Sequence, residues 1–248
     1  MEITPQAPTE VSFFHRQLFN KRAPVFSAAR YHGAMPISHP DYEQTRRLMV
    51  EHQLAARDIV DPRVLDAMRR VPRHLFVDEP YRKAAYRDYP LPIGYDQTIS
   101  QPYIVALMTQ LARPTADAIA LDVGTGCGYQ AAVLGELVSD VYSIEIIEPL
   151  AERATRRLAE MGYSNVHVQR GDGHRGWPEH APYDFILAAA APGHVPPALE
   201  EQLKPGGRLV IPVGEGYQEL LLIEKRPDGQ LAQRSISPVA FVPMTGRE

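Results

Sequence analysis

The second half of the sequence alternates short β-rich runs with helical runs, and this alternation most constrains the fold. The β-rich runs are AIALDV (118–123), VYSIEI (141–146), NVHVQR (165–170), YDFILAAA (183–190) and GRLVIPV (207–213). The helical runs between them are GYQAAVLGELV (128–138), EPLAERATRRLAEMG (148–162) and PPALEEQL (196–203). Strands that alternate with helices predict an α/β fold with a mostly parallel sheet and helices on both faces. The last two extended runs, 218–226 and 230–244, flank the turn signal Pro227-Asp228-Gly229 and predict an antiparallel hairpin at one edge.

The chain before this alternation divides into two parts. Residues 1–40 hold five prolines and little periodicity. This composition indicates an N-terminal extension that is partly disordered, or that carries a short docking helix around Phe13 and Phe19. From residue 41 the pattern becomes regular, and we expect 41–248 to form a single domain, since one α/β domain of this size is common.

Three helices are predicted between residues 41 and 116, ahead of the sheet segment 117–248. The first covers about residues 42–56. The second follows Asp61, a good N-cap, has Pro62 at its first position and runs to about residue 70. The third begins at or next to Pro102, with Ser100 or Gln101 near its cap.

Composition excludes several classes of function. A net charge of −4 and a pI near 6.1 give no general attraction for phosphate backbones, so we expect no nucleic-acid partner. The single cysteine, Cys127, cannot form an intramolecular disulfide, and no window approaches the roughly 18 apolar residues of a membrane span. These observations favour a cytoplasmic protein that has no membrane partner.

A glycine loop follows the first strand of the predicted sheet. In an open α/β sheet, ligands bind beyond the carboxyl ends of the strands. There Gly124, Gly126 and Gly128 are spaced G-x-G-x-G, and without Cβ atoms they let the backbone approach a ligand, although a tight strand-to-helix turn has the same pattern. The dinucleotide-binding fingerprint has a glycine at the position of Tyr129, so the ligand of this loop need not contain a pyrophosphate. Asp122 can accept hydrogen bonds within the loop or, directly or through water, from a cationic ligand.

Acidic residues also follow the next two strands. Glu145, with Ile146 beside it, can accept two hydrogen bonds from ribose hydroxyls. Asp172 can accept one from an exocyclic amine, and Gly173 leaves room for a flat ring. Together with the glycine loop, these residues predict a nucleoside site whose remaining part suits the amino-acid portion of S-adenosylmethionine. No metal is expected, because the histidines are dispersed and Cys127 lacks a partner at metal-ligand spacing.

A polar stretch, GYDQTISQPY (94–103), precedes the third helix and is predicted to be a loop. It gathers the hydroxyl and amide side chains of Gln97, Thr98 and Ser100 in one short run. Such groups can hold a polar part of a substrate without competing as nucleophiles. Ser100 also fits the role of a helix cap near Pro102.

Taken in order, these segments resemble the protein-L-isoaspartate O-methyltransferases, over about residues 42–246. The resemblance is carried by MVEHQLAARDIVDPRVLDAMRRVPRHLFV, GYDQTISQPYIVALM, LDVGTGCGYQAAVL, VYSIEIIEPLA, GDGHRGWPEHAPYD, AAAAPGHVPPALEEQLKPGGRLVIPVG and FVPMTG. The glycine loop and Glu145 are typical of methyltransferases in general, whereas TISQP and VPMT are more specific to this family. Two features depart from the usual pattern: the extension 1–40, and Asp96, an extra carboxylate that bears on the affinity for an anionic substrate.

The resemblance implies a Rossmann-like class I methyltransferase fold with a sheet of seven strands. The helices in 41–116 would then form a lid over the site. It also implies S-adenosylmethionine as cofactor, and isoaspartyl-containing proteins and peptides as substrates. Ser100 is expected at the active site and Thr245 near cofactor and substrate, while Gln97, Thr98 and Ile99 are expected to hold the substrate.

The chemistry of that substrate needs no general base. An isoaspartyl residue offers a free α-carboxylate with an ordinary pKa of about 3.5, which is ionised at pH 7. Ser100 would therefore position the carboxylate for methyl transfer. Two alternatives stay open: a small-molecule O-methyltransferase with the same cofactor site, and a protein that binds S-adenosylmethionine without turnover. A nicotinamide oxidoreductase is disfavoured by Tyr129, and the sequence does not fix an oligomeric state.

Overall fold

A computed structural model describes residues 41–246 of the 248-residue chain. The predicted extension, 1–40, lies outside these described residues. The helices are α1 (Tyr42–Met49), the π-helical turn η1 (Val50–Ala55), α2 (Pro62–Arg70), α3 (Pro102–Ala112), α4 (Tyr129–Gly135), α5 (Glu148–Glu160) and α6 (Pro197–Glu201), with the short 3-10 turns η2 (Arg73–Leu75), η3 (Glu79–Ala84), η4 (Gly173–Arg175) and η5 (Pro178–His180). The strands are β1 (Leu91–Gly94), β2 (Gln97–Ile99), β3 (Ile119–Val123), β4 (Asp140–Glu145), β5 (Val166–Arg170), β6 (Tyr183–Ala188), β7 (Leu203–Val213), β8 (Gln218–Lys225) and β9 (Leu231–Val239).

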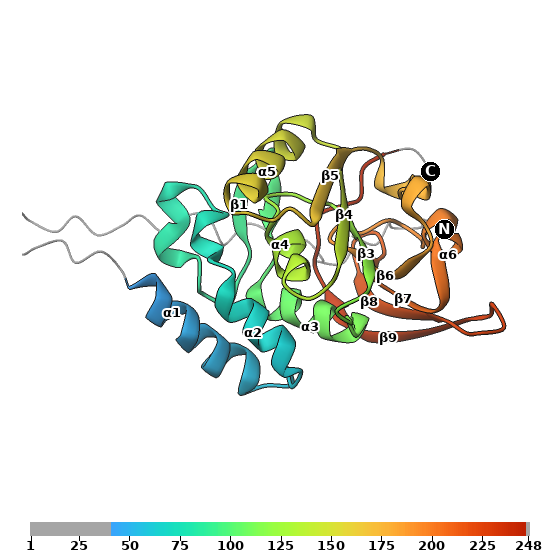
Figure 1. The fold of residues 1–248 in the computed structure, drawn as a ribbon, viewed down its shortest axis with the longest axis horizontal. Coiled ribbons are helices and arrows are strands. Elements are labelled where there is room, and N and C mark those ends of the chain that lie inside the picture. Colours follow the sequence, from blue (N-terminus) through green and yellow to red (C-terminus); the bar gives the residue numbers. More distant parts are fainter. Residues whose placement is uncertain (1–40, 247–248) are drawn as a thin grey trace, which may run out of the picture. The chain divides into compact units, whose positions relative to one another are not determined.

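Seven strands form the main sheet, in the order β5-β4-β3-β6-β7-β8-β9 (Figure 1). The first five of these strands are parallel to one another, whereas β8 runs antiparallel to both β7 and β9. The mostly parallel sheet and the antiparallel edge hairpin are confirmed. The strand order reverses at β3, because β4 and β5 extend the sheet on one side and β6 and β7 on the other. Such a switch point leaves a crevice at the carboxyl ends of the strands.

The sheet separates two apolar cores. Along β8, Leu220 and Leu222 belong to one core, while Leu221 and Ile223 belong to the other. This alternation follows from the two-residue period of a strand. Helices α1 to α5 pack into the first core and α6 into the second, so helices cover both faces as predicted (Figure 1). Within residues 41–246, no helix has both the length and the apolar content that a membrane crossing requires.

The helices before the sheet begin where their caps predict. Asp61 accepts a hydrogen bond from the backbone N–H of Arg63 (2.9 Å), and Pro62 is the first residue of α2. Gln101 is the N-cap residue of α3, which begins at Pro102. The division into a lid segment and a sheet segment remains a prediction.

The predicted loop at 94–103 is instead largely a β-hairpin, since β1 and β2 pair antiparallel with Leu91 opposite Ile99. Leu91, Ile93 and Ile99 are buried, and burying these apolar residues favours the hairpin over an open loop. The turn consists of Tyr95 and Asp96, with φ angles of 55° and 56°. Both values lie in the left-handed region that a two-residue type I′ turn requires. The hairpin therefore holds Gln97 and Thr98 at a fixed position, with Ser100 directly after its second strand.

Candidate functional site

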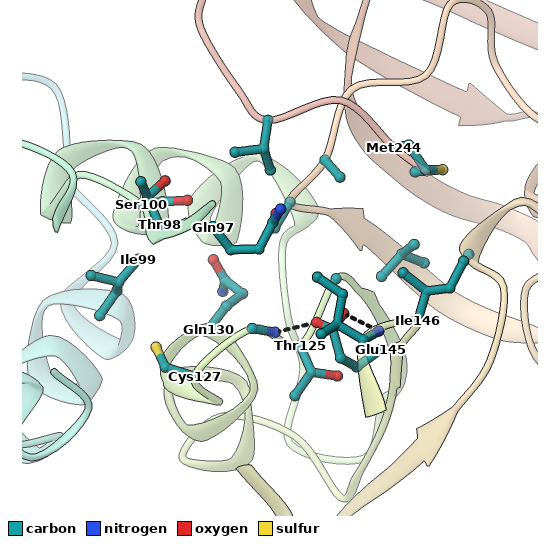
Figure 2. Close-up of a pocket in the computed structure, with 18 of the residues that line it drawn as sticks. Gln97, Thr98, Ile99, Ser100, Thr125, Cys127, Gln130, Glu145, Ile146 and Met244 are labelled. Carbon is teal, nitrogen blue, oxygen red and sulfur yellow. Dashed lines mark hydrogen bonds between the residues drawn. The ribbon is translucent and has the colours of Figure 1, made fainter. Parts of the chain in front are cut away.

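One pocket lies at the carboxyl ends of β3, β4 and β6, and is closed by the β1–β2 hairpin and the C-terminal segment. Its walls are Gln97, Thr98, Ile99, Ser100, Val105, Val123, Gly124, Thr125, Gly126, Cys127, Tyr129, Gln130, Ile144, Glu145, Ile146, Ile147, Gly173, Ala189, Ala190, Val242, Pro243, Met244 and Thr245. Figure 2 shows Thr98 and Ser100 on one side and Glu145 on the other, with Gln97 extending into the space between them. The pocket thus brings together most of the residues that the sequence analysis predicts for a cofactor and a substrate.

The glycine loop forms the floor of the pocket. The N–H groups of Gly124 and Thr125 donate to the carbonyl of Ile144 (2.8 and 3.1 Å), which ties the loop to the end of β4. Gly124 and Gly126 line the pocket, whereas Gly128 does not. Gly128 is the N-cap residue of α4 with φ of 90°, so it is required by the turn into the helix.

Glu145 is buried at the wall that faces Ser100, and two backbone amides hold its carboxylate. Its Oε2 accepts from Gly126 N–H (2.7 Å) and its Oε1 from Ile147 N–H (2.9 Å; Figure 2). Each carboxylate oxygen has two lone pairs, so each can still accept a hydrogen bond from a ligand. The amides also fix the orientation of the carboxylate before any ligand arrives.

Asp122 lies beneath the loop and is not on the pocket wall. Ser143 donates its hydroxyl hydrogen to Asp122 Oδ2 (2.7 Å), and Ser143 Oγ lies 2.6 Å from Thr125 Oγ1. Burial raises the pKa of Asp122 to about 7, against the lowering effect of the Ser143 hydrogen bond. The other oxygen, Oδ1, is buried and has no hydrogen-bond partner within residues 41–246. An ionised Asp122 would therefore be stabilised by a positive charge in the neighbouring pocket.

Asp172 and Gly173 both follow β5. Gly173 lines the pocket, whereas Asp172 does not. A Cβ on Gly173 would lie 2.5 Å from Val123 Cγ1, so a larger residue would force β3 to shift. Asp172 Oδ1 accepts from the backbone N–H of His174 (3.0 Å) and lies 3.2 Å from its Nδ1. The predicted contact between Asp172 and a cofactor amine remains a prediction.

The side facing Glu145 is polar and carries Ser100. The N-cap Gln101 makes no side-chain capping bond, and the Ser100 hydroxyl has no hydrogen-bond partner in the described part of the chain. Its interpretation as a helix cap is therefore not supported. Thr98 and Thr245 are exposed at the pocket, while the side chain of Ile99 is buried in the core.

The C-terminal segment reaches the pocket through a short bridge to the loop after β6. Ala191 N–H donates to the carbonyl of Val242 (2.9 Å), and Met244 N–H donates to the carbonyl of Ala191 (2.7 Å). These bonds place Met244 and Thr245 beside the ends of β3 and β4 in space. No local pattern in the sequence predicts this contact.

Several wall residues were not predicted. Ala189 and Ala190 follow β6, so the rule that ligands bind at strand ends applies to them as well, although neither offers a polar side chain. Gln130, in the first turn of α4, donates to Thr109 Oγ1 (3.0 Å). Cys127 is buried, and burial raises the pKa of its thiol. Within residues 41–246, no group of three His, Cys, Asp or Glu side chains is placed to bind a metal.

Comparisons with known proteins are consistent across sequence and structure. The sequence profile of the family described as protein-L-isoaspartate(D-aspartate) O-methyltransferase (PCMT) matches residues 44–248. Protein-L-isoaspartate O-methyltransferase 2 of Syntrophobacter fumaroxidans is 59% identical over 189 residues, which cover 75% of this chain and 76% of the relative. The enzyme of Opitutus terrae is 56% identical, over 84% of this chain and 91% of the relative. A solved protein-L-isoaspartate O-methyltransferase superposes with a TM-score of 0.74 at 28% identity, covering 83% of this chain and 66% of that chain.

Proposed function

Because this chain belongs to the protein-L-isoaspartate(D-aspartate) O-methyltransferase family, we propose that its pocket binds S-adenosylmethionine on the Glu145 side and an L-isoaspartyl α-carboxylate on the Ser100 side. The enzyme is an S-adenosylmethionine-dependent carboxyl methyltransferase that acts on isoaspartyl residues in damaged proteins and starts their repair. One observation supports the assignment of the two sides best: residues 97–100 and the glycine loop with Glu145 line the same pocket.

The residues of the cofactor side fit S-adenosylmethionine. Gly124 and Gly126 bring backbone without Cβ atoms to the wall, and the Glu145 carboxylate retains acceptor capacity for ribose hydroxyls. The buried, unpartnered Oδ1 of Asp122 fits a ligand that carries positive charge. When bound, the cofactor supplies an electrophilic methyl group on a sulfonium.

The residues of the substrate side fit an anion that has to be oriented. The hydroxyl of Ser100 can donate to one carboxylate oxygen, and Thr98 and Gln97 offer further donors on the same wall. Fixing both oxygens limits the orientations of the carboxylate and so accelerates transfer to it through proximity and orientation. These side chains are weaker nucleophiles than an ionised carboxylate at pH 7, so they do not compete for the methyl group.

No enzyme base is needed, and the pocket offers none suited to the task. The titratable side chains on the described wall are Glu145, Cys127 and Tyr129. Glu145 is already held by two amides, and burial raises the pKa of both Cys127 and Tyr129, so the thiol and the phenol stay protonated at neutral pH. The substrate α-carboxylate, with its ordinary pKa of about 3.5, needs no deprotonation there.

A pair of peptides that differ only in the linkage of one aspartyl residue tests the proposed function. The isoaspartyl peptide should accept the methyl group, and the aspartyl peptide should react far more slowly, because its side-chain carboxylate follows a backbone shorter by one methylene. Methyl ester formation would be measured by mass spectrometry after quenching. Equal rates would overturn the substrate assignment. Transfer only to small carboxylates, or cofactor binding without transfer, would indicate the alternative functions.

We also propose that the enzyme works in the cytoplasm and without nucleic acid as a partner. Its one cysteine is buried, and the net charge of −4 gives no general attraction for phosphate backbones. Cell fractionation would test the location, and binding to a labelled duplex at low salt would test the second statement.

A further inference from the structure

Two partly buried arginines, Arg153 and Arg157, lie on one face of α5. They are four residues apart, a spacing that places both side chains on the same side of a helix. Arg156 lies between them in the sequence and is exposed. The N-cap residue of α5 is Ile147, whose N–H donates to Glu145. Both arginines therefore extend from a helix that is fixed to the cofactor side of the pocket.

Arg157 reaches the glycine loop. Its Nη1 donates to the carbonyl of Cys127 (2.8 Å), and its guanidinium lies 5.6 Å from the centroid of the Phe76 ring. Because Phe76 is buried, its ring limits the directions in which the guanidinium can point. The hydrogen bond thus fixes the loop backbone next to Gly126, which lines the pocket.

Arg153 reaches the β1–β2 hairpin. Its Nη2 donates to the carbonyl of Ile93. The register of the hairpin shifts at this residue, and no residue of β2 is paired with Ile93. Such an extra residue in a strand lacks a ladder partner, and here an arginine from another element supplies a donor to its carbonyl. Arg153 therefore holds the hairpin at the point where its own pairing is irregular.

The glycine loop and the hairpin also touch each other. Ile93 is buried, and its Cδ1 lies 3.2 Å from the position that a Cβ on Gly126 would take. The hairpin thus packs directly on the loop, whose Gly126 N–H donates to Glu145 (2.7 Å). Because protein interiors are close-packed, a shift of the hairpin against α5 would be felt by the loop as well.

We propose that Arg153 and Arg157 are positioning residues that hold the β1–β2 hairpin and the glycine loop at a fixed spacing, and that they thereby couple binding of the cofactor to binding of the isoaspartyl carboxylate; this inference rests on the proposed function. Neither arginine lines the pocket, so both act through the backbone that they hold. A cofactor that orders the loop and Glu145 also steadies α5, and through it the hairpin that presents the substrate side. By reciprocity, the substrate tightens cofactor binding by the same factor.

The affinity of an isoaspartyl peptide with and without S-adenosylhomocysteine measures this coupling. The sulfur of this product is neutral, so it does not attract the peptide carboxylate as a sulfonium would. Titration calorimetry on the full chain should give a peptide Kd that is roughly fivefold lower, or more, when S-adenosylhomocysteine is saturating. Fivefold is about the lower end of ordinary coupling between two sites.

Substitutions on α5 then locate the coupling. Arg153→Met and Arg157→Met remove the donors but keep unbranched side chains, and each should lower the ratio of the two Kd values to less than about twofold. Arg153→Met should also slow single-turnover methyl transfer about tenfold, because a displaced hairpin misaligns the carboxylate, while S-adenosylmethionine affinity without peptide stays nearly unchanged. Arg153→Lys keeps a donor and should restore part of both losses. Arg156→Met, at the exposed neighbour, is the matched control and should leave the ratio unchanged.

A milder variant tests the contact between hairpin and loop. Ile93→Val removes the Cδ1 atom that lies over Gly126 and should also lower the ratio of the two Kd values. Circular dichroism shows which variants are folded. If the methionine variants do not fold, an unchanged ratio in Ile93→Val overturns the inference.

The remaining outcomes separate this inference from the proposed function. A wild-type enzyme that methylates the isoaspartyl peptide but shows a ratio near one would overturn the coupling and leave the activity in place. So would an unchanged ratio in folded methionine variants, or an equal fall in Arg156→Met. A wild-type enzyme that neither binds nor methylates the isoaspartyl peptide would overturn the proposed function, and this inference with it.

Discussion

At the scale of single residues, Ser100 should control the rate of transfer and not the binding of the cofactor. Its hydroxyl has no hydrogen-bond partner within 41–246, so Ser100→Ala removes a donor without leaving a protein group unpaired. Single-turnover methyl transfer should slow roughly 10- to 1000-fold, with S-adenosylmethionine affinity almost unchanged. Ser235→Ala, at an exposed residue of β9, is the control and should not change the rate; rapid-quench measurements give both rates.

The rate of methyl transfer by the wild-type enzyme should not depend on pH between about pH 6 and 8. A bell-shaped pH profile centred near pH 7 would contradict a mechanism without a base.

Asp122 should make the stability of the cofactor-free protein depend on pH. Its folded pKa, about 7, lies above the ordinary aspartate value of 3.8, so between these values the native state keeps a proton that the unfolded state releases. The contribution of Asp122 to the free energy of unfolding therefore falls as the pH rises through this window, by at most about 1.4 kcal/mol per pH unit. Asp122→Asn should gain stability relative to wild type between pH 5 and pH 8, as measured by urea unfolding. The same relative stability at both pH values would show that Asp122 is ionised throughout.

At the scale of elements, Asp88 holds the start of α3, immediately after Ser100. Its Oδ2 accepts from Gln101 Nε2 (2.8 Å) and Arg57 (3.1 Å), and its Oδ1 accepts from Tyr103 N–H (3.2 Å). Asp88→Ala should cost about 1 to 2 kcal/mol of stability, as the loss of a helix cap does, and should also slow methyl transfer because the Ser100 backbone loses its support.

The matched control for this element is Asp61→Ala. Asp61 is the N-cap residue of α2 and accepts hydrogen bonds from Arg63, and this helix begins away from the pocket. It should cost similar stability, by urea unfolding, and leave kcat unchanged. If both variants slow transfer equally, the effect of Asp88 comes from general destabilisation and not from the position of Ser100.

At the scale of the whole molecule, the N-terminal extension should be dispensable for the chemistry. Every residue predicted for cofactor or substrate lies between 97 and 245. A chain that begins at Ile37 should therefore keep both its S-adenosylmethionine affinity, by titration calorimetry, and its kcat on an isoaspartyl peptide. A truncated protein that folds but does not turn over would place the extension in the lid, or in an oligomer contact that completes the site.

The order of the sheet strands and helices along the chain could be predicted from the sequence, because those signals are local. The β-rich and helical runs after residue 117 correspond to β3 through β9 and α4 to α6. Asp61 and Pro62 start α2, since a cap depends on the residues next to it. The glycine loop and Glu145 were predicted to belong to one site because ligands bind beyond the carboxyl ends of the strands, and both line the same pocket.

Which of the predicted residues reach the pocket could not be predicted from local patterns, because it depends on the complete fold. Asp122 pairs with Ser143 across β3 and β4, and its side chain is buried beneath the loop by the pleat of the sheet. Residues 91–99 form a hairpin because three of their apolar residues are buried in a core built by distant helices. Thr245 reaches the pocket through bonds between Ala191 and the segment 242–244, a contact between residues more than 50 positions apart. Local patterns cannot encode such contacts, because they depend on how the complete sheet places its ends.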